Sequence, residues 1–198
     1  MKPDFQTSFN KSMSAEGIIS NNAADKGDFT YKGISRVMHP TWPGWKIIDS
    51  ILPSLALIRR GTEGEVLNDN QQLNQLVEQF YRFEFWNKIQ GDRLPSQLIA
   101  DELFDCSINL GVPVASEFLQ KTINLLNRNG SLYVDITIDG IIASQTLVAL
   151  NKCNAVNGEK LVFNLLNFYQ AKRYIEIMEK DHSQEIFIGW FSRIDIIK

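Results

Sequence analysis

Three long segments with helical periodicity predict a mainly α-helical protein. In residues 70–89, apolar side chains recur every three or four positions and form a single stripe made of Leu73, Leu76, Val77, Phe80 and Phe83. A second segment, residues 95–110, begins at Pro95, which suits a first helical turn, and stops at Gly111. The third segment covers residues 159–178. These segments leave little room for an extended sheet.

The remaining chain is predicted to hold shorter elements. A helix is expected over residues 4–16, where Phe5, Phe9, Met13 and Glu16 are spaced by four, four and three, and Gly17 can end it. Residues 114–127 and 144–150 are also predicted to be helical. Between residues 18 and 53 the composition favours Asn, Asp, Gly, Pro and Ser, so we expect mostly loop or short irregular elements.

One β feature is predicted in the C-terminal half. The run SLYVDITI, residues 131–138, alternates and favours β-branched side chains, so we expect a short hairpin or strand pair closed by Asp139 and Gly140. A soft boundary lies at Gln90-Gly91-Asp92-Arg93. It divides the chain into residues 1–92 and 93–198, and the short joint indicates two regions that pack together.

Composition limits the classes of function. A chain of 198 residues with 44% hydrophobic residues is long enough for a globular core, and a net charge of -3 supplies no basic face for nucleic acid. Cys106 and Cys153 are in no metal-binding or disulfide spacing, so both are predicted to be free structural thiols. His39 and His182 lack suitable partners and are expected to be surface or capping residues, which leaves no predicted metal site.

The chain shows no membrane-spanning apolar run and no apolar secretory signal at its start. We therefore expect no membrane insertion and synthesis in the cytoplasm. If the substrate lies outside the cytoplasm, another component has to bring the protein there.

Glu16 is the most informative carboxylate. Its spacing places it on the same helix face as Phe5, Phe9 and Met13, and at the C-terminal end of the helix. Partial desolvation and the helix dipole both disfavour ionisation and would raise its pKa, as a glycosidase general acid requires. The alternative is an ordinary helix-end glutamate that reaches solvent.

Further candidates follow on the polar loop and beyond it. Asp25 and Thr30 could flank a sugar and position water or stabilise positive charge. Asp28 is a competing carboxylate nearby. Asp25 is equally compatible with a structural role in a turn. Four aromatic side chains are candidates for stacking on sugar rings, with the protein core as the alternative: Tyr31, Trp42, Trp45 and Trp86.

The sequence AEGIISNNAADKGDFTYKGIS resembles the start of the glycoside hydrolase family 108 muramidases, also known as secretion activator proteins. Their pattern is E-G-G-Y followed by D-x-G-G-x-T-x-x-G-I, with the glutamate as the catalytic residue. The matching residues are Glu16, Gly17, Asp25, Gly27, Thr30, Gly33 and Ile34. The chain departs from the pattern at Ile18, Ile19 and Asp28.

The second half is similar to the peptidoglycan-binding domain that usually follows in this family. The similarity is carried by Phe104, Asp105, Asn109, Gly111, Ala115, Leu119 and Gln120, and continues at Asp139, Gly140, Thr146, Leu147, Gly189, Trp190 and Arg193. Asn109 and Gln120 could be sugar contacts, but buried ties at helix ends are favoured.

The resemblance implies a lysozyme-like helical fold and hydrolysis of the β-1,4 bond between N-acetylmuramic acid and N-acetylglucosamine, without cofactor or metal. It implies Glu16 as general acid, helped by Asp25 and Thr30, with peptidoglycan glycan strands as the partner. Because this substrate lies in the bacterial periplasm or cell wall, a protein made in the bacterial cytoplasm would need a holin or export partner, or lysis, to reach it. Two alternatives stay open: a lytic transglycosylase, and a non-catalytic peptidoglycan-binding or secretion-assisting protein. The departures at Ile18 and Asp28 motivate the second.

Overall fold

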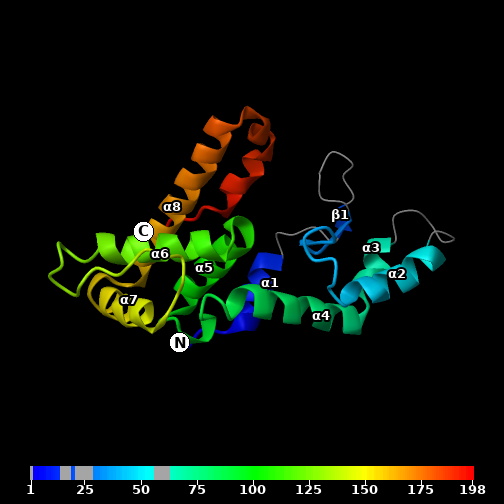
Figure 1. Ribbon diagram of the computed structural model, residues 1–198, viewed down its shortest axis with the longest axis horizontal. Helices are drawn as coiled ribbons and strands as arrows, with labels where there is room; N and C mark the ends of the chain where they lie inside the picture. Colours follow the sequence, from blue (N-terminus) through cyan, green and yellow to red (C-terminus); the bar gives the residue numbers. More distant parts are fainter. Residues whose placement is uncertain (1, 14–18, 21–28, 56–62) are drawn as a thin grey trace. The chain divides into compact units, whose positions relative to one another are not determined.

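The computed structural model describes residues 2–13, 19–20, 29–55 and 63–198 (Figure 1). Most of these residues lie in helices, which confirms the predicted mainly α fold. The chain divides into two compact units, one of Phe9–Phe83 and one that combines Met1–Ser8 with Glu84–Lys198. The predicted division after residue 92 differs from this one by nine residues and stays a prediction.

The unit of residues 9–83 combines short helices with a small sheet. It contains the end of α1 (Phe5–Met13), α2 (Gly44–Leu55), α3 (Glu63–Asn68) and α4 (Gln71–Tyr81). The strands β1 (Ile19–Ser20), β2 (Thr30–Tyr31) and β3 (Ile34–Ser35) form an antiparallel sheet in the order β1-β2-β3. Helix α4 begins where the Asn70 side chain accepts a hydrogen bond from the Leu73 amide at 2.9 Å.

Helix α2 corrects the expectation that residues 18–53 are mostly loop. Pro43 and Gly44 are residues typical of turns, but here they stand at the start of this helix, where the missing proline N–H costs no hydrogen bond. Trp45 and Ile48, three positions apart, are buried. The helical spacing was therefore present in the sequence, and the neighbouring turn-forming residues obscured it.

The other unit is a helical bundle. It contains the π-helical turn η1 (Arg82–Trp86, shared at its start with the first unit), the 3-10 turn η2 (Gly91–Arg93), and the helices α5 (Gln97–Leu110), α6 (Val112–Leu125), α7 (Ser144–Asn157) and α8 (Glu159–Lys180). Helix α5 packs against α6 and α8, and the 3-10 segment η3 (His182–Arg193) returns along α8 (Figure 1). Cys106 and Cys153 are buried and free, as predicted. No helix in the described part of the chain is long and apolar enough to cross a membrane.

The first residues of the chain belong to this bundle. The Phe5 ring meets the rings of Trp86 and Phe104 edge to face, at centroid distances of 5.7 and 5.9 Å. The Ser8 hydroxyl donates to Asp101 Oδ1 at 2.6 Å, and the Asp4 amide donates to Gln97 Oε1 at 2.7 Å. Residues 1–8 therefore contribute both apolar and polar contacts to a unit whose other residues begin at 84.

The predicted hairpin is wrong in position. A short antiparallel hairpin exists, but it is β2–β3 in the first unit, and residues 131–138 hold no strand. The side-chain amides of Asn124 and Asn127 bond this segment instead. Gln120 in the same way bonds the backbone amides of Asp139 and Gly140, which follow the segment. Asn124 both accepts from the Ile136 amide at 2.9 Å and donates to its carbonyl at 2.8 Å. Side chains thus supply the bonds that a partner strand would supply.

Candidate functional site

The predicted catalytic residues begin just beyond α1. Phe5 and Phe9 are buried along one face of α1, as the predicted stripe requires. Helix α1 is described as far as Met13. Glu16 and Asp25, together with the end of the predicted helix at Gly17, lie outside the described residues.

Thr30, the third predicted catalytic residue, lies on β2. It pairs with Ser20 on one side and Ser35 on the other. Its neighbour Tyr31 is fully buried, and because side chains alternate along a strand, Thr30 faces the opposite, partly exposed side of the sheet.

A tight turn fixes this strand. Tyr31 pairs with Ile34, so the connection contains only Lys32 and Gly33, whose φ angles are +43° and +78°. Two-residue hairpins favour turns in which both central residues have positive φ. The Tyr81 hydroxyl donates to the Lys32 carbonyl at 2.7 Å, and Lys32 Nζ donates to Asn74 Oδ1 at 2.8 Å. Burial lowers the pKa of Lys32, while the negative charge of Glu78 acts in the opposite direction.

The aromatic candidates of the first unit are core residues in the described arrangement. Tyr31, Trp42 and Trp45 are 0, 7 and 4% exposed. The Tyr31 hydroxyl donates to the Leu67 carbonyl at 3.1 Å, and burial raises its pKa to about 12. The Trp45 indole donates to the His39 carbonyl at 2.7 Å. These rings present no open face to a sugar, so the core alternative fits them better than the stacking role.

Trp86 is also buried, in the other unit. Its ring packs against Phe5 and Phe104, and its Nε1 donates to Asp92 Oδ1 at 3.0 Å. Like the first three aromatics, it is a core residue in this arrangement. The two histidines differ from each other: His182 is exposed beside Glu185, as predicted, whereas His39 is half-buried with its ring 4.7 Å from that of Phe80.

Asn109 and Gln120 make the contacts expected of structural ties. Asn109 donates to the Asp105 carbonyl one helical turn earlier at 2.8 Å. Gln120 is 1% exposed and uses both ends of its amide. Its Nε2 donates to Asp139 Oδ1 and the Ile141 carbonyl, and its Oε1 accepts from the amides of Asp139 and Gly140. All four hydrogen-bonding positions of Gln120 are occupied, which leaves none for a sugar.

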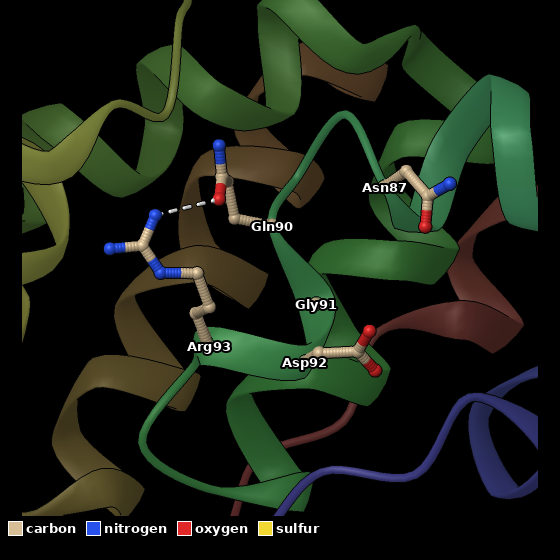
Figure 2. Close-up of a pocket in the computed structure, with 5 residues that line it drawn as sticks. All are labelled: Asn87, Gln90, Gly91, Asp92 and Arg93. Carbon is tan, nitrogen blue, oxygen red and sulfur yellow. Dashed lines mark hydrogen bonds between the residues drawn. The ribbon is translucent and has the colours of Figure 1, made fainter.

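The second unit also holds a pocket that the sequence did not indicate. It has a volume of about 270 Å³ and is lined by Asn87, Gln90, Gly91, Asp92 and Arg93 (Figure 2). Arg93 Nη1 donates to Gln90 Oε1 at 3.0 Å. In the sequence these residues were interpreted only as a joint between regions. The sequence signal that could have indicated a pocket is the concentration of amide, carboxylate and guanidinium groups around Gly91.

No group of three His, Cys, Asp or Glu side chains in the described ranges could hold a metal ion.

Comparison with models of protein families identifies the family. The model of the family described as glycosyl hydrolase 108 matches residues 9–111, and the model described as a predicted peptidoglycan domain matches residues 114–195. No curated protein sequence matches the chain significantly. Among solved structures, the chain is similar to Brucella abortus SagA, with 22% identity over 96% of this chain and 88% of that chain and a TM-score of 0.63. That likeness concerns the fold. Because the glycosyl hydrolase 108 model covers more than half of the chain, the chain belongs to this family and is a glycoside hydrolase with a peptidoglycan-binding domain.

Proposed function

We propose that the chain is an N-acetylmuramidase that hydrolyses the β-1,4 bond between N-acetylmuramic acid and N-acetylglucosamine. The observation that carries the proposal is the match of the family model to residues 9–111, a range that contains Glu16, Asp25 and Thr30. The peptidoglycan-domain match that follows supports the same substrate.

Glu16 is proposed as the general acid, because in the sequence it continues the helical spacing of Phe5, Phe9 and Met13. Phe5 and Phe9 are buried on one face of α1, and a carboxyl group that continues such a stripe is partly desolvated. Protonated Glu16 gives its proton to the leaving glycosidic oxygen. Asp25 and Thr30 position the water or stabilise the oxocarbenium-like transition state. Thr30 supports this role in one respect only: it lies on the partly exposed side of β2.

The test compares Glu16→Gln with the parent on purified peptidoglycan. Glutamine keeps the size and hydrogen bonds of the side chain but has no carboxyl proton to donate, so turbidity clearing should slow by about 10²- to 10⁴-fold. Pelleting with insoluble peptidoglycan should persist. Glu117→Gln, at a half-buried ion pair with Lys121, is the matched control and should keep full activity.

The products separate the alternatives. A muramidase releases reducing N-acetylmuramic acid ends, whereas a lytic transglycosylase releases anhydro ends, and mass spectrometry distinguishes the two. A non-catalytic binder would clear no peptidoglycan and would pellet equally with either residue at position 16. A Glu16→Gln protein as active as the parent contradicts the assignment of the general acid.

A further inference from the structure

We propose that the pocket of residues 87–93 is a carboxylate-binding site that takes the carboxylates of peptidoglycan. Its residues are separate from Glu16, Asp25 and Thr30. The inference rests on the proposed function for the source of the ligand, and on the pocket for its chemistry.

The chemistry follows from one hydrogen bond. A guanidinium group can only donate, so the Gln90 amide has to turn its oxygen toward Arg93, whose Nη1 lies 3.0 Å from it (Figure 2). This contact occupies Gln90 Oε1 and leaves Gln90 Nε2 as a donor. Arg93 keeps the N–H groups of Nε and Nη2. The Gln90–Arg93 pair therefore presents donors and a positive charge, and a carboxylate is the complementary group.

The turn that carries this pair is held in place before any ligand arrives. Gln90 has a φ of +58°, a conformation that costs energy for a non-glycine residue and has to be maintained by its surroundings. Backbone bonds from the Gln90 amide to the Asn87 carbonyl and from the Arg93 amide to the Gln90 carbonyl close the turn at 3.1 and 2.8 Å. Such a preformed arrangement lowers the ordering cost of binding.

Asp92 does not neutralise Arg93 in this arrangement. Its Oδ1 accepts from the indole of buried Trp86, and its side chain points away from the Gln90–Arg93 pair (Figure 2). The positive charge of Arg93 is therefore available to a ligand. Locally it also offsets the net charge of -3 that would repel an anionic polymer.

The volume favours a small group. At about 270 Å³, the pocket is smaller than the sites of roughly 300–1,000 Å³ that hold drug-sized ligands. Peptidoglycan offers a carboxylate on its peptides and, where the peptide has been removed, on the lactyl group of N-acetylmuramic acid.

The test is a titration of ¹⁵N-labelled full-length protein that follows the side-chain N–H signals of Gln90 and Arg93. Three probes separate the sources: N-acetylmuramic acid carries the lactyl carboxylate, muramyl dipeptide carries a carboxylate on its peptide, and N-acetylglucosamine carries none. We expect at least one of the first two probes to shift both signals and N-acetylglucosamine to leave them unchanged. Equal shifts with all three probes, or shifts with none, would overturn the site.

Arg93→Gln and Arg173→Gln form a matched pair of variants. Both remove one exposed arginine charge, but Arg173 lies on α8 outside the pocket. Arg93→Gln should weaken carboxylate binding by about ten- to a hundred-fold and Arg173→Gln should not. Unchanged binding by Arg93→Gln would refute the proposal, while the products of peptidoglycan digestion would still decide the muramidase activity independently.

Discussion

At the scale of single residues, Gly91 and Trp86 show how a glycine can be required by packing alone. Gly91 has no positive φ, so backbone freedom does not explain it. A Cβ atom at this position would lie 2.3 Å from the Trp86 ring. That ring is fully buried and also held by Asp92, so it has little room to move.

Gly91→Ala should therefore lower the free energy of unfolding by about 1–3 kcal/mol, the usual cost of forcing extra atoms into a packed site. Urea denaturation followed by circular dichroism measures the change. Gly189→Ala is the control, because a Cβ there would meet nothing within 4 Å, and it should leave stability nearly unchanged. Equal stability of the two variants would show that the Trp86 ring yields to the new methyl group.

At the scale of elements, α6 and the segment after it explain the misplaced hairpin. Gln120, Asn124 and Asn127 are spaced by four and three, which puts their amides on one face of the helix and its final turn. Asn127 alone accepts from the amides of Leu132 and Tyr133 and donates to the Tyr133 carbonyl and to Asp135 Oδ1. An alternating pattern of β-branched residues predicts an extended backbone. It does not predict whether a second strand or side chains form the hydrogen bonds to that backbone.

Replacement of Asn127 by alanine should destabilise the bundle by about 2–4 kcal/mol, since several bonds are lost and partly buried backbone groups of Leu132 and Tyr133 are left without these partners. The amide protons of Leu132 and Tyr133 should exchange faster with solvent. Asn151→Ala removes an amide that bonds only within its own helix and is exposed, so its effect should stay within about 0.5 kcal/mol. Unchanged exchange at Tyr133 in the Asn127 variant would contradict the role given to this side chain.

The elements that were predicted well carry their own end signals. Residues 95–110 were predicted and α5 covers Gln97–Leu110, which Gly111, with φ of +90°, ends as predicted. The predicted start is corrected: Ser96 caps the helix, so Pro95 lies before it and not in its first turn. Helix α2 was missed because a proline followed by a glycine, here Pro43 and Gly44, occurs both at the start of a helix and in a turn. Local signals thus locate helices whose ends are marked, and fail where the same residues serve two purposes.

At the scale of the whole molecule, sequence order was more informative about function than any residue taken alone. The resemblance predicted a glycoside hydrolase region followed by a peptidoglycan-binding region, and the two family models match in that order. Burial was harder to predict, because the sequence does not distinguish a tryptophan that lines a cleft from one that fills a core. The pocket at Gly91 was missed for a related reason. Its side chains are brought together by a turn with positive φ at Gln90, which the sequence does not predict.

The whole chain also shows that a compact unit need not be continuous in sequence. Met1–Ser8 group with Glu84–Lys198 rather than with the residues that directly follow them. Phe5 supplies the apolar part of this association, through its contacts with Trp86 and Phe104. A fragment cut at a boundary near residue 92 would therefore lack part of its own core.

Phe5→Ala tests this arrangement in the intact chain. Helix α5 carries Phe104, and its residues Gln97 and Asp101 bond to Asp4 and Ser8. Removal of a buried phenylalanine side chain typically costs about 3–5 kcal/mol. The amides of α5 should therefore lose protection against hydrogen exchange by a comparable free energy. Lys2→Ala changes an exposed side chain in the same segment and should leave α5 as protected as in the parent. If α5 keeps its protection when Phe5 is replaced, residues 1–8 are an accessory to the bundle and not a part of its core.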